Sequence, residues 1–243
     1  MDIRVYRDYH EMSRAAAQII ADQIRSKPDS VLGLATGSTP EGMYAELVKM
    51  YREGKVDFSK ATSFNLDEYV GMDPSDPRSY HRFMRVNLFD HVNFAPGKTH
   101  VPSGIGDNLD EQAMEYERMI AAAGGIDLQV LGIGMNGHIG FNEPGSPFDS
   151  RTRVVDLSEQ TVSVNREKTE AESLPTQAVS MGMGTILQSR RIMLLANGAG
   201  KAEIVSRAFK GPITTDVPAS VLQRHPDVIV ILDAPAARLL DSK

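Results

Sequence analysis

Two residues able to move protons stand close together in the glycine-rich segment MNGHIGFNEPG, which follows the apolar run at Leu128. His138 lies between Gly137 and Ile139, and the carboxylate of Glu143 can reach back across a turn to orient the imidazole and support a positive charge on it. The nearby glycines favour close approach of the backbone to a ligand. The segment predicts a proton-transfer site, and a purely structural loop histidine is the alternative.

A second candidate is the carboxylate pair Asp67 and Glu68 in SFNLDEYVG, where an apolar stretch ends. Side chains alternate along a strand, so we expect only one of the two carboxylates to face a ligand. Partial burial would raise the pKa of that carboxyl toward neutral pH, which suits a general base. A helix-capping aspartate is the alternative interpretation.

A third feature is typical of an anion site. In ATGSTPEG, which follows an apolar run, Gly37 permits an unusual turn, and Ser38 and Thr39 offer hydroxyls and N-cap chemistry at a helix start. A well-capped turn without a ligand is the alternative. The segment is neither a Walker sequence nor GxGxxG. Arg166, and Lys201 in NGAGK, are candidate cationic partners for a phosphate.

Composition excludes several classes of site and partner. The chain has no cysteine, and the 26 basic and 32 acidic residues give a net charge of -6, which disfavours a nucleic-acid binder. A metal site is a weak alternative, because His138 has no second histidine at ligand spacing. The charged amino terminus and the absence of a long apolar run predict a cytoplasmic protein without membrane contact.

Helical and apolar segments alternate along the chain. We expect helices near 8–25, 40–52, 79–91 and 108–123, and strands near 31–35, 61–65, 128–133, 191–196 and 228–232. This alternation predicts an α/β fold, a three-layer α/β/α sandwich around a mostly parallel sheet. We expect one domain over residues 1–243, with residues of about 144–185 as an excursion that covers the site as a lid.

With these motifs in view, the chain resembles the glucosamine-6-phosphate deaminase family nearly from end to end. The resemblance rests on LATGSTPEGMY, FNLDEYVGM, LGIGMNGHIGFNEPG and GAGK, in family order and spacing. It implies a Rossmann-like single domain and no cofactor. It also implies an isomerase–deaminase that converts glucosamine 6-phosphate and water to fructose 6-phosphate and ammonia in amino-sugar catabolism.

The resemblance also implies roles for individual residues. Asp67 would move the C2 proton to C1 through a cis-enolamine, and His138 would open the pyranose ring. Glu143 and Asn136 would support His138 in that step. The phosphate would lie on an anion site that comprises Gly37, Ser38, Thr39, Arg166 and Lys201.

In two respects the chain departs from the family pattern. Many members carry Asp where this chain has Asn136, so a second carboxylate on His138 is missing here. The chain also ends before the carboxyl-terminal segment of the allosteric hexamers, so we expect unregulated activity and a monomer or small homo-oligomer. Arg151 and Arg153, which resemble effector-binding positions, would then have structural work only.

Two other functions remain open at this point. A 6-phosphogluconolactonase would share the sheet and the GH turn, although its usual sequence after the histidine differs from IGFNEPG. An inactive sugar-phosphate sensor is the other alternative, and the intact Asp67, His138 and Glu143 oppose it.

Overall fold

The central feature of the computed structural model is a seven-stranded parallel sheet in the order β1-β10-β9-β6-β2-β3-β5. The structure describes residues 1–159, 161–163 and 175–240. The strands of this sheet are β1 (Asp2–Tyr6), β2 (Val31–Leu34), β3 (Thr62–Asn65), β5 (Thr99–His100), β6 (Leu128–Leu131), β9 (Arg191–Ala196) and β10 (Val228–Asp233). The α/β class and the mostly parallel sheet are as predicted.

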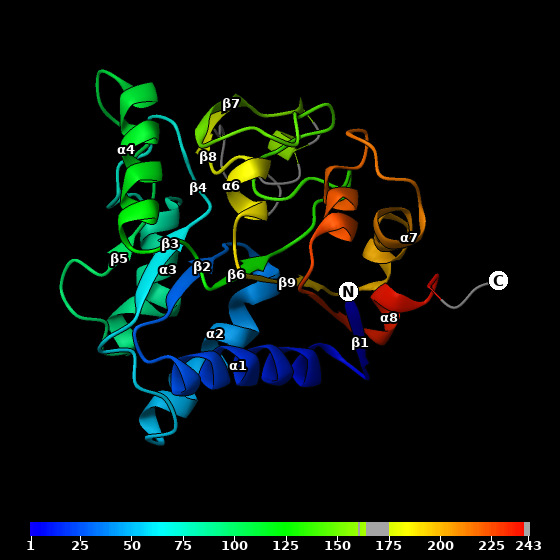
Figure 1. The fold of residues 1–243 in the computed structure, drawn as a ribbon, viewed down its shortest axis with the longest axis horizontal. Coiled ribbons are helices and arrows are strands. Elements are labelled where there is room, and N and C mark those ends of the chain that lie inside the picture. The colour runs from blue at the N-terminus through cyan, green and yellow to red at the C-terminus, as the bar shows by residue number, and fades with distance from the viewer. Residues whose placement is uncertain (160, 164–174, 241–243) are drawn as a thin grey trace.

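Helices form the two outer layers. Figure 1 shows α1 and α2, which pack on each other, on one side of the sheet, and α4, α6 and α7 on the other. The helices are α1 (Tyr9–Ser26), α2 (Ser38–Arg52), α3 (Tyr80–Asn87), α4 (Leu109–Ala122), α6 (Met183–Leu187), α7 (Ala202–Lys210) and α8 (Ala234–Ala237), with 3-10 turns η1 (Phe89–His91), η2 (Ala199–Lys201) and η3 (Pro218–Arg224). Every residue of β2, β6 and β10 is buried, as expected for strands covered on both faces.

The strand order changes direction beside β2. From β2 the chain proceeds to β3 and β5 on one side, and it then returns to place β6 on the other side of β2. The loops that leave the carboxyl ends of β2 and β6 therefore diverge. Such a switch point opens a crevice at the edge of the sheet where ligands of α/β proteins bind.

A second, antiparallel sheet stands over that edge. Its order is β4-β8-β7, with β4 (Asp67–Tyr69) pairing to β8 (Gln177–Ser180) and β8 to β7 (Arg153–Asp156). The described part of the predicted excursion thus includes two strands, which hold β4 as a third. The excursion is joined to the site through Asp67, whose register partner is Ser180.

Some predicted helices have different ends in the structure, and some strands were not predicted. The helix expected over 79–91 ends at Asn87, because Leu88 has a φ of -142°, and η1 follows it. The helix expected from Pro40 begins at Ser38. The strands β1, β4, β5, β7 and β8 were not predicted, because they are short or lie at an exposed sheet edge.

Candidate active site

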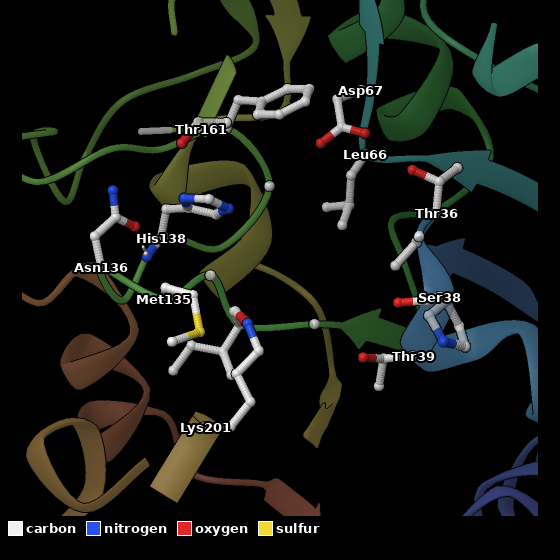
Figure 2. Close-up of a pocket in the computed structure, with 18 of the residues that line it drawn as sticks. Thr36, Ser38, Thr39, Leu66, Asp67, Met135, Asn136, His138, Thr161 and Lys201 are labelled. Atoms are coloured by element: carbon white, nitrogen blue, oxygen red, sulfur yellow. Dashed lines mark hydrogen bonds between the residues drawn. The ribbon is translucent and has the colours of Figure 1, made fainter. Parts of the chain in front are cut away.

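A cavity of about 270 Å³ lies at the carboxyl edge of the sheet, at the switch point between β2 and β6. Loops after β2, β3, β6 and β9 contribute to its walls. Those walls comprise 35–40, 66–67, Tyr80, 132–136, His138, 140–141, Thr161, Asn197 and Lys201. Figure 2 shows the Asp67 carboxylate and the His138 imidazole on different walls of this space, with Ser38, Thr39 and Lys201 toward its other end.

The loop after β6 places His138 in the cavity wall. The amide of Gly134 donates to the carbonyl of His138 at 2.9 Å, which closes a tight turn. A Cβ at Gly134 would lie 2.3 Å from Cε1 of the imidazole, so the ring packs directly on this glycine. Gly137 has a φ of +89°, in the left-handed region that favours glycine. Gly134 and Gly137 therefore allow the loop to place the imidazole of His138 in the cavity wall.

Glu143 stands behind the imidazole. Its Oε2 lies 3.5 Å from Nδ1 of His138 and accepts a hydrogen bond from Nδ2 of Asn136 at 2.6 Å. Its Oε1 accepts from the Thr161 hydroxyl at 2.5 Å. Burial raises the pKa of the Glu143 carboxyl, but these donors and His138 outweigh burial and bring it to about 2. The glutamate is therefore a fixed anion beside His138.

Asn136 also contacts the histidine directly. The backbone amide of His138 donates to Oδ1 of Asn136 at 3.2 Å, while the Asn136 side-chain amide donates to Glu143. A single asparagine thus uses both ends of its amide to hold the two members of the His–Glu pair. An aspartate at this position could accept the first hydrogen bond but could not donate the second.

Asp67 begins β4 and faces the cavity from the opposite side. It is 6% exposed, and burial together with the negative charge of Glu68 raises the pKa of its carboxyl to about 8. The adjacent Glu68 points away and accepts hydrogen bonds from the backbone amides of Tyr80 and His81, at the start of α3. The alternation predicted for the two carboxylates is what the structure shows.

The start of α2 forms the other end of the cavity. Gly37 is the N-cap residue, with a φ of 103° and no side-chain cap, so the prediction of side-chain capping by Ser38 or Thr39 was wrong. Both hydroxyl residues lie inside the first turn instead, where backbone amides lack helical partners. The Tyr9 hydroxyl binds this turn through the carbonyls of Ser38 and Thr39. The arrangement is suited to an anion.

Lys201 lies at the end of η2 and lines the same end of the cavity. Its Nζ donates to the carbonyl of Ile133 at 2.7 Å, which ties η2 to the loop after β6. The ammonium group therefore adds positive charge next to the start of α2. Arg166, the other predicted cation, lies outside the described residues.

The polar wall residues Thr36, Asn197 and Thr161 were not predicted from the sequence. Thr36 precedes Gly37 in the same motif and could have been found there. Asn197 accepts a hydrogen bond from the Thr39 hydroxyl at 2.8 Å, which links the loops after β2 and β9. Thr161 comes from the excursion, where no local pattern marks it.

The two arginines that resemble effector-binding positions have partners within the protein. Arg151 pairs with Glu117 of α4 at 2.5 Å, and Arg153 donates to Oδ1 of Asn142 at 3.0 Å. Over the described ranges no cluster of three or more potential metal-ligating side chains is found. Within the same ranges no helix has the length and apolar character needed to cross a membrane.

Comparisons with known proteins identify the family. A family model described as glucosamine-6-phosphate isomerases/6-phosphogluconolactonase matches residues 8–230. The chain belongs to this family. A glucosamine-6-phosphate deaminase of Thermoanaerobacter pseudethanolicus is 50% identical over 241 residues, or 99% of this chain and 95% of that protein. One of Clostridium botulinum is 51% identical over 244 residues and the whole of both chains.

Solved structures of the glucosamine-6-phosphate isomerase/6-phosphogluconolactonase family agree with the fold. A monomeric glucosamine-6-phosphate deaminase superposes with a TM-score of 0.95 at 45% identity, covering 98% of this chain and 100% of the other. The 6-phosphogluconolactonase of Trypanosoma cruzi has a TM-score of 0.79 at 21% identity, covering 99% and 97%. The likeness to the lactonase concerns the fold alone, so the deaminases are the relatives that bear on the function of this chain. The family resemblance stated from the sequence is confirmed.

Proposed function

We propose that the chain converts glucosamine 6-phosphate and water to fructose 6-phosphate and ammonia, by aldose–ketose isomerisation followed by deamination. One observation supports this most directly: a carboxylate with a raised pKa and a Glu-supported imidazole face one cavity whose far end is built for an anion. The relatives at half identity carry the name of this activity. The reaction needs only acid–base groups and a water molecule.

In the proposed mechanism the phosphate binds first at the start of α2. The amides of Gly37, Ser38 and Thr39 and the ammonium of Lys201 hold it. Arg166, which lies outside the described residues, is assigned as a further cationic partner from the sequence resemblance alone. Because the phosphate is distant from C1 and C2, these groups anchor the sugar without taking part in the chemistry. The reacting carbons then lie between the walls that carry Asp67 and His138.

Ring opening is assigned to His138. The imidazole transfers a proton between the anomeric hydroxyl and the ring oxygen, and the Glu143 carboxylate stabilises its charged form across 3.5 Å. Asn136 holds Glu143 and His138 in position relative to each other through its two hydrogen bonds. The open-chain aldehyde is the product of this step.

Asp67 then carries out the isomerisation. It removes the proton from C2 while the C1 oxygen takes a proton from the substrate ammonium, which leaves an enolamine. Return of the C2 proton to C1 then leaves a protonated imine at C2. Water adds to that imine, and ammonia departs as C2 becomes the ketone of fructose 6-phosphate. A pKa of about 8 matches this work, because the group can both accept and release a proton near neutral pH. The ammonium of the substrate would further favour the ionised form.

An assay of three products tests the proposal against its alternatives. Ammonia and fructose 6-phosphate from glucosamine 6-phosphate support a deaminase. Acid release from 6-phosphogluconolactone without ammonia would support a lactonase, and binding of either sugar phosphate without turnover would support a sensor.

Two variants test the roles of the reacting groups. Asp67→Asn should lose C2–H exchange in deuterated water by about 10²- to 10⁴-fold, the usual contribution of a general base, and keep phosphate binding. His138→Gln should slow ring opening but spare substrate already in the open form. Turnover of Asp67→Asn within tenfold of the parent chain would contradict the assignment of the base.

The anion end has its own test. Lys201→Ala should raise KM with little change in kcat, because the lysine holds a group that does not react. An unchanged KM would place the phosphate elsewhere.

We also propose that the chain acts as a single domain and as a monomer, with residues 144–185 as its lid. The solved deaminase at 45% identity is described as monomeric, and the described strands of this excursion pair with β4, which carries Asp67. Light scattering after size-exclusion chromatography measures whether the chain is a monomer. Limited proteolysis with and without fructose 6-phosphate tests the lid, and equal cleavage in both conditions would argue against it.

A further inference from the structure

Thr161 links the excursion after β7 to the His–Glu pair. It is 5% exposed and lines the cavity, and its Oγ1 donates to Oε1 of Glu143 at 2.5 Å. In Figure 2 it lies beside His138, on the wall of the cavity that also carries Asn136. Its contact partner is thus a group of the proposed ring-opening machinery.

The direction of this hydrogen bond is fixed by its neighbours. The Ser158 hydroxyl donates to Oγ1 of Thr161 at 3.0 Å, and the backbone amide of Thr161 donates to Oγ of Ser158 at 3.2 Å. A hydroxyl carries one proton, so with Ser158 as its donor Thr161 has that proton available for the carboxylate. The chain of bonds runs from Ser158 through Thr161 to Glu143.

The two oxygens of Glu143 have separate tasks. Oε1 faces Thr161, while Oε2 faces Asn136 and the imidazole of His138. Rotation of the carboxylate would break contacts on both sides. A hydroxyl is also a neutral donor, so it stabilises the carboxylate ion without cancelling its charge, which stays available to His138.

We infer that Thr161 is a positioning residue for ring opening, which holds Glu143 ionised and aimed at His138 and so makes that step depend on the segment after β7. The inference rests on the proposed function, in which Glu143 supports the imidazole. The hydrogen bond from Thr161 is one of the contacts that lower the pKa of Glu143 against the effect of burial. Without it, burial would act with less opposition.

The test is Thr161→Val, which removes the hydroxyl and nearly keeps the volume. We expect kcat to fall about tenfold or more, as for loss of a hydrogen bond to a charged group, with KM changed less than about twofold. The loss should be larger at pH 5 than at pH 8, because Glu143 binds a proton more readily. Thr161→Ser, which keeps the hydroxyl, should restore most of the rate.

Thr185→Val is the matched control. The Thr185 hydroxyl makes the same kind of bond, at 2.5 Å, to Oε1 of Glu117, and Thr185 is not part of the cavity wall. Both valine variants should lose thermal stability, but only Thr161→Val should change kcat and its pH dependence. Equal kcat values and pH profiles in the two variants would overturn the inference.

A measurement without substrate separates this inference from the proposed function. The carboxyl carbon-13 signal of Glu143, identified by its loss in Glu143→Gln, should titrate at higher pH in Thr161→Val than in the parent chain or Thr185→Val. An unshifted titration would refute the role of Thr161 even in an active deaminase. A shifted titration in a chain that releases no ammonia would keep the role and reject the proposed activity.

Discussion

The surroundings of two carboxyl groups in one site shift their pKa values in opposite directions. Burial and the charge of Glu68 raise the pKa of Asp67 to about 8, while His138 and the donors Thr161 and Asn136 bring that of Glu143 to about 2 despite burial. One group is therefore ready to exchange a proton, and the other is a permanent anion. Acid–base enzymes commonly divide work between two carboxyl groups in this way.

Asp67→Asn should stabilise the fold in alkaline solution. The pKa of Asp67 is higher in the folded chain than the ordinary value of 3.8, so ionisation favours the unfolded state and the fold loses stability as pH rises toward about 8. The variant cannot ionise, so its advantage in free energy of unfolding should grow between about pH 4 and pH 8, by at most about 1.4 kcal/mol per pH unit, and then level off. Urea titrations at pH 5 and pH 9 measure this, and equal differences at the two values would contradict it.

Gly134→Ala should disable His138 without straining the backbone. The new methyl would lie 2.3 Å from the imidazole, so the ring must move away from Glu143. We expect kcat to fall about 10²-fold, as for a displaced general acid–base group. Gly200→Ala in η2 is the control, because the nearest atom to a Cβ there is Cε of Met135 at 3.9 Å, an ordinary contact, and Gly200 is not part of the cavity wall. Similar kcat values for the two variants would show that the close packing is unimportant.

At the scale of elements, β4 positions the base. It leaves the large sheet after β3 and pairs with β8, while Glu68 of the same strand binds the start of α3 with its carboxylate. A buried anion at a helix amino terminus is favourable because the backbone amides there lack partners. The contacts of Glu68 thus fix the strand that presents Asp67.

Glu68→Gln should lower the free energy of unfolding and lower the pKa of Asp67. Glutamine places an amide donor where Glu68 accepts hydrogen bonds from Tyr80 and His81, so we expect a loss of about 1–3 kcal/mol in unfolding free energy. Removal of the negative charge should lower the pKa of Asp67, so the acid limb of the kcat/KM profile should move to lower pH. Glu115→Gln on the exposed face of α4 is the control. An acid limb that stays in place would contradict the coupling of the two carboxylates.

The sequence predicted elements well where burial imposed a long local pattern. The apolar runs at β2, β6 and β10 and the glycine-rich turns that follow β2 and β6 were found, because strand and turn signals are adjacent there. β4 and β5 have three and two residues, which is too short for an alternating pattern to be recognised. Their pairing depends on tertiary contacts.

Site residues show the same division. His138 and Glu143 share one turn, so their spacing alone indicated a pair. Thr161 contacts Glu143 over 18 residues and Asn197 contacts Thr39 over 158, and each is a common surface residue type. No local pattern marks a hydroxyl or amide whose partner is that distant, so neither could be predicted.

The molecule as a whole separates chemistry and stability between the two edges of its sheet. The cavity lies at the carboxyl edge, while Asp127 stands just before β6 at the amino edge and is 5% exposed. There it accepts hydrogen bonds from Lys27 at 2.6 Å, the amide of Val31 at 2.8 Å and Arg190 at 3.0 Å. One carboxylate thus joins the segments that lead into β2, β6 and β9.

Asp127→Asn should therefore destabilise the protein and leave catalysis alone. We expect about 1–3 kcal/mol less unfolding free energy, because a buried backbone amide and two cations lose their anionic partner, and a kcat/KM within about twofold. Asp227→Asn, which breaks the exposed pair with Arg191, should cost less than about 1 kcal/mol. Equal costs, or a large drop in kcat/KM, would contradict the separation.

The hydrogen bond between Thr39 and Asn197 spans 158 positions of the chain. The nascent polypeptide therefore cannot complete its active cavity until β9 and the turn after it have left the ribosome and docked beside β6. An amino-terminal fragment that stops before Asn197 would hold Asp67 and His138 yet lack a wall. Enzyme activity, followed during refolding from urea, should therefore return only after β9 has joined the sheet beside β6.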